Sequence, residues 1–195
     1  VDGLVRLHGR WTVVMEYIDG LDLRQIISVN PMPVGPALEV VREVSDALDV
    51  AFNAIGTEDQ PLRLLHRDIK PSNIMIDESG LVKVCDFGVA RAEFSERESE
   101  TRQLQFGSVD YMAPERLLFE NEGPASDIYS MGCTLFEMLC GEKLGRAKRV
   151  SSDHEAFLID RLSFMRGNRS ISGSGPVALE SLMHRILAFE ASDRP

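Results

Sequence analysis

Apolar and polar positions follow two different periods along this chain, short near the start and helical afterwards. Residues 4–8 and 11–17 are apolar runs on either side of a Gly-Arg pair, which predicts two paired strands joined by a tight turn. Residues 21–29 have the pattern of a short helix, which an Asn-Pro pair ends. In residues 36–51 apolar side chains recur every three or four positions behind a proline that fits a first helical turn, so we expect an amphipathic helix there.

The rest of the chain is predicted to be mostly helical. Residues 74–76 and 82–84 predict two short strands around a tight turn. Residues 127–139 are apolar on nearly every side, so the helix expected there, with Ser126 as its N-cap, should be buried. Another helix is expected over residues 176–189. With the strands early and the helices late, the predicted fold class is α+β with a mainly helical body.

Composition limits the class of protein. The chain has 195 residues, of which 44% are hydrophobic and 27% charged, as in a soluble globular domain. Its net charge of −10 argues against a nucleic-acid binder, which normally presents a basic surface. One basic cluster is interpreted as a solvated loop, with a docking patch as the alternative. It consists of Lys143, Arg146, Lys148 and Arg149.

The cysteines and the apolar runs favour a cytoplasmic location. Cys85, Cys133 and Cys140 are an odd number without C-x-x-C spacing, which fits free thiols in a reducing compartment rather than disulfides or a zinc site. No apolar run reaches the roughly 18 residues of a membrane span, and no signal peptide opens the chain. Because the sequence runs from Val1 to Pro195 without an initiating Met, we interpret it as a fragment, and a membrane anchor elsewhere in the parent protein stays open.

Two short strings carry the chemistry of this chain. The first is His-Arg-Asp-Ile-Lys-Pro-Ser-Asn at residues 66–73, and the second is Asp-Phe-Gly at residues 86–88. Phosphoryl transfer needs a base near the acceptor hydroxyl, oxygen ligands for Mg²⁺ and positive charge near the moving phosphate. The two Asp, the Lys and the Asn of these strings supply all three, so the strings indicate phosphoryl transfer.

The chain resembles the C-terminal lobe of a eukaryotic-type serine/threonine protein kinase, with the last strands and the hinge of the N-terminal lobe attached. Ala113-Pro114-Glu115, a helix start at 127–132 and Arg194 follow the two strings in the family's order. The resemblance implies a protein-kinase-like α+β fold. In it, residues 1–18 are N-lobe strands and the start of the hinge, and residues 19–195 are a C-lobe truncated at its end.

The resemblance implies roles in phosphate transfer for four residues. Asp68 matches the catalytic base, and Lys70, which follows the serine/threonine kinase pattern, would offset charge near the γ-phosphate. Asn73, which is also counted with the catalytic residues, and Asp86 match the ligands of Mg²⁺. The implied reaction transfers the γ-phosphate of ATP to serine or threonine hydroxyls of proteins, with ATP and Mg²⁺ as cofactors.

Several matching residues are implied to be structural. His66 is expected to pack with Phe87 and Leu7 in a hydrophobic column that links the lobes. Gly88 would permit the backbone turn after Phe87. Ser108 is expected to bridge the catalytic Asp and Lys.

Two further contacts are expected behind the catalytic loop. Glu115 and Arg194 should form a buried ion pair. Asp127 should accept hydrogen bonds from backbone N–H groups of the catalytic loop. Both would hold the site rather than take part in the chemistry.

The nucleotide pocket is implied by position. Met15 matches the gatekeeper behind adenine, and the backbone groups of Glu16 and Ile18 would hydrogen-bond the adenine edge. Asp22 could accept from ribose hydroxyls, and Met75 would form the apolar floor. An ordinary core Met and a helix N-terminal Asp are equally good interpretations of the last two residues.

The polar stretch 91–112 matches the family's activation segment. Arg67 matches the residue that pairs with a phosphate on that segment in many relatives. We therefore expect activation by phosphorylation at Thr101 or Ser99. The alternative is that acidic neighbours in the segment already neutralise Arg67.

Three parts of the family's nucleotide site do not occur in the sequence: a Gly-rich loop, a strand lysine and the helix Glu that pairs with it. Since Val1 comes too late to encode them, the chain alone is expected to bind ATP weakly and to transfer no phosphate. The parent is expected to be an active kinase, whose partners are ATP and protein substrates and not nucleic acid. The alternative is a pseudokinase or scaffold binding module. A small-molecule phosphotransferase is disfavoured by Ala113-Pro114-Glu115, which would build a peptide-docking platform.

Overall fold

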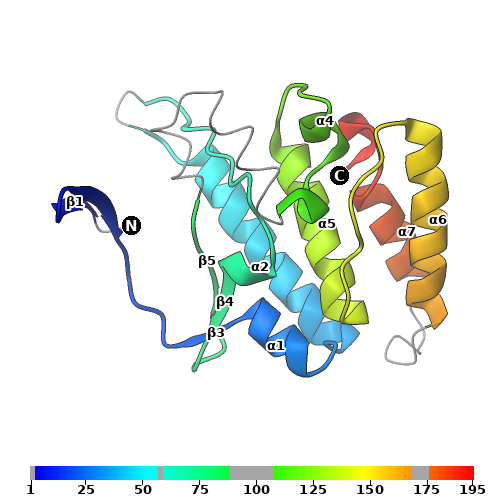
Figure 1. The fold of residues 1–195 in the computed structure, drawn as a ribbon, viewed down its shortest axis with the longest axis horizontal. Coiled ribbons are helices and arrows are strands. Elements are labelled where there is room, and N and C mark those ends of the chain that lie inside the picture. Colours follow the sequence, from blue (N-terminus) through cyan, green and yellow to red (C-terminus); the bar gives the residue numbers. More distant parts are fainter. Residues whose placement is uncertain (1–2, 57–58, 88–107, 168–175) are drawn as a thin grey trace.

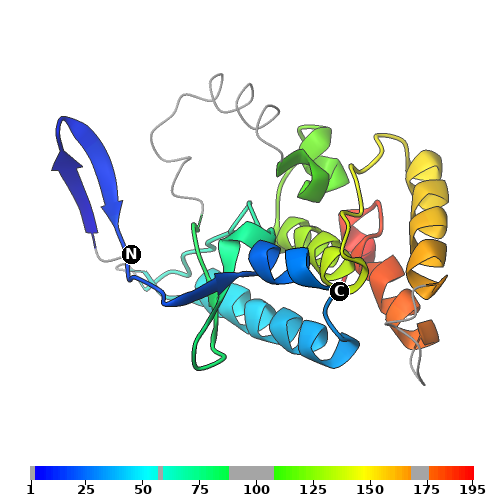
Figure 2. The ribbon, with the colours of Figure 1, turned by 60° about the horizontal axis from the view of Figure 1, so that its bottom comes forward.

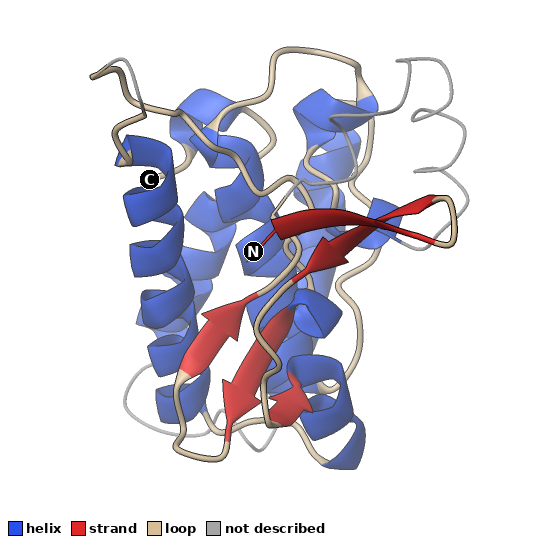
Figure 3. Cartoon of the chain, turned by 90° about the vertical axis from the view of Figure 1, so that its left-hand side faces the viewer, coloured by secondary structure: helices blue, strands red, loops and turns tan. Residues whose placement is uncertain are grey.

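The computed structural model describes residues 3–56, 59–87, 108–167 and 176–195. Within these ranges the chain forms a β-hairpin, a small three-stranded sheet and a larger body of helices (Figure 1). The mainly helical body is as predicted. The sheet lies along one side of the helices (Figure 3).

The hairpin at the start of the chain consists of β1 (Gly3–Leu7) and β2 (Arg10–Val14), which pair antiparallel. His8 and Gly9 form its turn with φ angles of 49° and 80°, a backbone region in which glycine is unstrained. The second strand ends at Val14, three residues earlier than predicted. Figures 1 and 2 show the hairpin projecting away from the helical body.

The three-stranded sheet has the order β3-β4-β5, with antiparallel neighbours. Strands β4 (Ile74–Asp77) and β5 (Val82–Val84) match the predicted pair, but β3 (Gly20–Asp22) was not predicted. The first residue of β3 has to be glycine, because a Cβ on Gly20 would lie 2.2 Å from the carbonyl oxygen of Ile76. The sheet ties the segment before the first helix to the strands that follow the catalytic loop.

Six α-helices form the body within the described part of the chain. They are α1 (Leu23–Val29), α2 (Val34–Asn53), α4 (Pro114–Leu117), α5 (Pro124–Cys140), α6 (Ser151–Gly167) and α7 (Pro176–Ile186). Short 3₁₀ turns lie at Pro71–Asn73, Ser108–Tyr111 and Ala191–Asp193. None of these helices is long and apolar enough to cross a membrane.

Helix α5 forms the centre of the body, with α2 on one side and α6 and α7 on the other (Figure 1). Nearly all of its residues are buried, as the apolar pattern predicted. The helix begins earlier than predicted, because Gly123 is its N-cap and Pro124 fits its first turn, so Ser126 is the third helical residue. Gly141 ends it in the left-handed conformation with φ 74°.

Candidate active site

The first string, residues 66–73, folds into a loop whose polar side chains contact one another, and this loop is the predicted catalytic loop. The Lys70 Nζ donates to Asp68 Oδ2 over 2.6 Å. The Asn73 amide nitrogen donates to the same oxygen over 3.0 Å and to the Asp68 carbonyl over 2.8 Å. Asp68 is partly exposed, with 38% of its side chain accessible. The loop therefore fixes one carboxylate at the surface with a cation and an amide beside it.

The Asp-Phe-Gly string is attached to this loop through Cys85. The Cys85 N–H donates to the Asn73 carbonyl over 2.8 Å, and the Cys85 carbonyl accepts from His66 Nε2 over 2.8 Å. The next residue, Asp86, is exposed and has φ 61°, which is uncommon for a residue other than glycine. The backbone of Cys85 therefore joins the second string to His66 and Asn73, the first and last residues of the first string.

His66 is a buried link between the two strings. Its ring is fully buried and lies 4.7 Å, centroid to centroid, from the ring of Phe87. The Asp68 N–H donates to His66 Nδ1 over 3.2 Å, so the neutral ring that carries its proton on Nε2 satisfies both contacts. Burial lowers the pKa of His66, which favours this neutral form.

The predicted column does not include Leu7. The Leu7 side chain is 53% exposed, and its strand belongs to the hairpin that projects from the body. The expectation that Leu7 packs on His66 and Phe87 is therefore wrong in this structure. A pair of short strands pairs mainly with itself, so its direction relative to the loop is set by the segment that follows β2.

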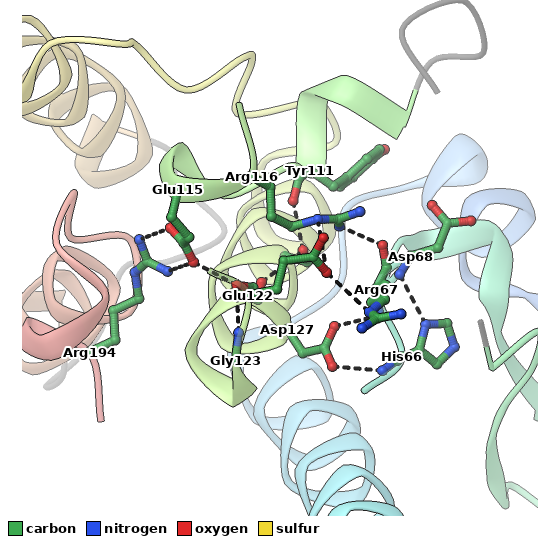
Figure 4. A network of polar contacts seen from close by, with 12 residues as sticks. His66, Arg67, Asp68, Tyr111, Glu115, Arg116, Glu122, Gly123, Asp127 and Arg194 are labelled. Carbon is green, nitrogen blue, oxygen red and sulfur yellow. Dashed lines mark hydrogen bonds and ion pairs between the residues drawn. The ribbon is translucent and has the colours of Figure 1, made fainter. Parts of the chain in front are cut away.

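Asp127, in the first turn of α5, holds the loop from below (Figure 4). Its Oδ2 accepts from the His66 N–H over 2.8 Å, and its Oδ1 accepts from the Arg67 N–H over 2.7 Å. This is the predicted contact with the catalytic loop. Burial raises the pKa of Asp127, although the two backbone hydrogen bonds oppose the rise.

Arg67 has a partner that sequence reasoning missed. The Arg67 Nε lies 3.1 Å from Glu122 Oε2, and the Arg116 Nε lies 3.8 Å from the same oxygen. The Arg116 Nη1 also donates to the Arg67 carbonyl over 2.5 Å. Figure 4 shows the three side chains together. Neither Arg116 nor Glu122 belongs to a recognised string, and their position in the sequence gave no signal of this contact.

The predicted ion pair between Glu115 and Arg194 is present and buried. Arg194 Nη1 and Nη2 donate to the two Glu115 carboxylate oxygens over 2.7 and 2.8 Å, and the Arg194 side chain is 0% exposed. Ser126 Oγ donates to Glu115 as well. Burial works against the charged carboxylate, but the hydrogen bonds from Arg194 and Ser126 hold the pKa of Glu115 below its ordinary value.

A cavity of about 400 Å³ lies between the second string and residues 15–18, which follow β2 and are called the hinge segment below. Its lining includes three of the residues predicted to face the nucleotide, together with part of β5 and the start of the Asp-Phe-Gly string. The lining residues are Val13, Met15, Glu16, Ile18, Lys83, Val84, Cys85, Asp86 and Phe87. An ion pair between Lys83 and Glu16, which the sequence did not indicate, joins β5 to the hinge segment.

The other two residues predicted for the nucleotide site pair with each other across β3 and β4. Asp22 is the N-cap of α1, and its Oδ1 accepts from the Gln25 N–H over 2.8 Å. Met75 is half-buried in β4. Neither lines the cavity of the hinge segment. Asp22 therefore has a helix-capping contact, the alternative that the sequence left open.

Some predicted residues lie outside the described part of the chain. They are Gly88, Ser99 and Thr101, and the side chain of Ser108 is likewise not described. Among the described residues, no group of three or more His, Cys, Asp and Glu side chains is placed to hold a metal ion. The two residues predicted to bind Mg²⁺ are one in each string, with Asn73 buried and Asp86 exposed.

The fold and the loop geometry together define a protein kinase lobe. The family model described as the protein kinase domain matches residues 2–195, and the chain belongs to this family. It is similar to the probable serine/threonine-protein kinase PknB of Lactococcus lactis, with 40% identity over 131 residues that make up 67% of this chain and 20% of that protein. It is 38% identical over 131 residues to PknB of Mycobacterium leprae, with the same coverage. The chain spans about a fifth of the length of these relatives.

Solved structures show the same fold. The PknI kinase domain of Mycobacterium tuberculosis matches with a TM-score of 0.66 and 24% identity over 100% of this chain and 64% of that one. A double mutant of the PknI domain matches with a TM-score of 0.64 and 22% identity over the same shares of the two chains. The predicted protein-kinase-like fold is thereby confirmed.

Proposed function

We propose that the protein containing this chain is an ATP-dependent serine/threonine protein kinase. The observation that carries the proposal is the loop in which Lys70 and Asn73 both donate to one oxygen of Asp68. Family membership and the similarity to serine/threonine kinases support it. Its substrates would be serine and threonine hydroxyls of proteins.

In this proposal Asp68 accepts the proton of the substrate hydroxyl. Its carboxylate is partly exposed, so an acceptor side chain can reach it, and the contacts from Lys70 and Asn73 fix its direction. The Lys70 ammonium lies beside the carboxylate and supplies positive charge where the phosphoryl group would pass. Positioning and charge are the main contributions that phosphoryl transfer asks of a protein.

The donor chemistry of the site fits Mg²⁺. Asn73 uses its amide nitrogen to hold Asp68, so its amide oxygen is the atom that can bind a cation. Asp86 adds a carboxylate at the point where Cys85 ties the second string to Asn73. Hard oxygen ligands of this kind suit Mg²⁺, which would neutralise phosphate charge when bound.

The cavity of the hinge segment is proposed as the nucleotide side of the site. Its lining combines Met15, Glu16 and Ile18 with Asp86 and Phe87 of the second string. In the proposal, the base binds beside residues 15–18 and the phosphates lie toward Asp86. Backbone groups of the hinge would hydrogen-bond the edge of the base.

The test is transfer of radiolabelled phosphate from ATP by the full-length protein, with dephosphorylated casein as acceptor. Asp68→Asn and Asp86→Ala should each lower kcat by at least about a hundredfold, because the first removes the proposed base for the acceptor hydroxyl and the second removes a proposed ligand of Mg²⁺. Phosphoamino-acid analysis should find phosphoserine and phosphothreonine.

Asp160→Asn is the matched control, since Asp160 is an exposed aspartate on α6 and should leave transfer unchanged. If the wild type transfers no more phosphate than Asp68→Asn, the kinase proposal fails and a scaffold function takes its place. Phosphotyrosine as the main product would overturn the serine/threonine assignment.

A further inference from the structure

The backbone just before the proposed catalytic base is strained and held from two sides. Arg67 has φ 69°, in the left-handed region that residues other than glycine rarely occupy. Such conformations persist only where the surroundings determine them. Here the Arg67 N–H donates to Asp127, and the Arg67 carbonyl accepts from Arg116. Because the next residue is Asp68, these contacts set where the carboxylate of Asp68 lies.

The Arg67 side chain supplies a third contact through Glu122. Arg67 Nε lies 3.1 Å from Glu122 Oε2, and Arg116 Nε lies 3.8 Å from it, so one carboxylate lies between two guanidinium groups (Figure 4). Arg116 lies in α4, and Glu122 lies two residues before α5. One charge cluster therefore joins the catalytic loop to two helices that carry no catalytic residue.

The charged cluster of Arg67, Arg116 and Glu122 is partly shielded from water, which strengthens the interactions between its charges. The side chains of Arg116 and Glu122 are 5% and 18% exposed, while that of Arg67 is 40% exposed. Charges shielded from water interact more strongly than exposed ones. Without the carboxylate, the two guanidinium groups would repel each other, and the Arg116 contact with the Arg67 carbonyl would weaken. A phosphate on the activation segment is another anion that could pair with Arg67, and among the described residues Glu122 is the anion in that position.

We propose that Glu122 is a positioning residue for phosphoryl transfer. Its carboxylate holds Arg67 and Arg116 together, and so keeps Asp68 in place without a phosphate on the activation segment. Phosphorylation at Ser99 or Thr101, which the sequence predicted as the partner of Arg67, is then not required for turnover. The proposal rests on the proposed kinase function.

The first test measures turnover of full-length protein that phosphatase treatment has left unphosphorylated, as intact-mass spectrometry confirms. The unphosphorylated wild type should keep its kcat within about twofold, and Glu122→Gln should lose about tenfold in kcat, or about 1.4 kcal/mol of transition-state stabilisation. The KM for ATP should not change, because Glu122 does not line the proposed nucleotide cavity. Glu122→Asp keeps the charge and should recover part of the loss.

Glu120→Gln is the matched control, because Glu120 is an exposed carboxylate on the same connection and should leave kcat unchanged. A wild type that turns over only when phosphorylated would overturn the proposal. So would a Glu122→Gln variant with the kcat of the wild type. Equal losses in Glu122→Gln and Glu122→Asp, together with a raised KM, would indicate general damage instead of positioning.

The second test does not depend on catalysis. Hydrogen exchange at the amides of residues 66–68 should be faster in Glu122→Gln than in the wild type, and unchanged in Glu120→Gln. If the wild type transfers no phosphate in either phosphorylation state, the kinase function fails, and hydrogen exchange then decides only whether Glu122 has the role of holding residues 66–68 in place. Unchanged exchange at these amides in Glu122→Gln would overturn that role.

Discussion

At the scale of single residues, His154 is a titratable side chain that packs in the core of the helical body. Its ring is fully buried among three aromatic rings, those of Tyr129, Phe157 and Phe189, at centroid distances of 5.8 to 5.9 Å. His154 Nε2 lies 2.8 Å from the Leu187 carbonyl, to which a neutral ring donates. Burial, helped by nearby positive charge, lowers the pKa of His154 below the ordinary value of 6.5.

This shift predicts that acid weakens the fold. Below about pH 6.5 the unfolded chain binds a proton at His154 that the folded chain does not, so the free energy of unfolding falls as the pH falls. One such histidine contributes at most about 1.4 kcal/mol per pH unit. Urea unfolding at pH 7.5 and pH 5.5 should show the loss, and His154→Gln should reduce it.

His8→Asn serves as the control, because His8 is exposed in the hairpin turn and asparagine tolerates its positive φ. It should leave the pH dependence as it is in the wild type. A His154→Gln variant that loses as much stability between the two pH values as the wild type would contradict the prediction. His66, whose pKa burial also lowers, accounts for loss that remains.

At the scale of elements, the close contact between α5 and α7 depends on one glycine. A Cβ on Gly132 would lie 2.4 Å from Ile186 Cγ2 and 2.9 Å from Leu187 Cδ2, and both of these side chains are buried. Gly132→Ala should therefore lower the free energy of unfolding by about 1–3 kcal/mol through overpacking. Urea unfolding measures the change.

Gly35→Ala is the matched control on α2, since a Cβ there meets nothing within 4 Å. It should be neutral or stabilise the protein by up to about 1 kcal/mol, because alanine is the better helix former. Equal effects of the two substitutions would mean that α7 moves aside, and that the contact with Gly132 does not fix the helix pair.

Whether a helix could be predicted from the sequence depended on how clearly its apolar positions differ from its polar ones. Helix α5 was predicted because it is apolar on nearly every side, so neighbouring elements bury it from several directions. Helix α6 was missed although His154, Leu158 and Leu162 are buried at helical spacing. Its exposed faces carry Ile159 and Phe164, which are 57% and 49% accessible and obscure the period. Strand β3 was missed because three residues give no period.

Some residues of the site could also be predicted from the sequence, and others could not. Asp68, Lys70 and Asn73 could be found from sequence because their contacts lie within one loop and their spacing is itself the signal. The contact of Glu122 with Arg67 joins residues 55 positions apart in the sequence, and only the path of α4 and α5 brings them together. Leu7 was wrongly placed in the column because the placement came from the resemblance, and a match of motifs does not say which way a projecting hairpin turns.

At the scale of the whole molecule, the pair of Glu115 and Arg194 connects α4 to the far end of the chain. Arg194 also donates to the carbonyls of Ala125, Ala188 and Phe189 at 2.8 to 2.9 Å. Arg194→Met should cost about 3–5 kcal/mol of unfolding free energy, because it leaves the buried Glu115 charge without its partner. Thermal and urea unfolding measure the loss.

Two further variants separate the ion pair from the packing around it. Arg166→Met breaks the exposed pair with Glu180 and should cost less than about 1 kcal/mol. The double variant Glu115→Leu with Arg194→Met should be more stable than Arg194→Met alone, because no buried charge remains. A double variant less stable than either single one would mean that the Arg194 contacts with backbone carbonyls dominate.

The same pair sets an order of events during synthesis on the ribosome. Glu115 and Arg194 are 79 residues apart, so their contact cannot form until the ribosome has released nearly all of this sequence. Until then the Glu115 carboxylate lacks the guanidinium of Arg194 that neutralises it, and Ser126 is its other side-chain partner. Contacts this far apart in sequence also form slowly, because a long loop must close first. A ribosome that pauses before residue 194 would therefore hold this lobe in a state that chaperones and proteases can reach.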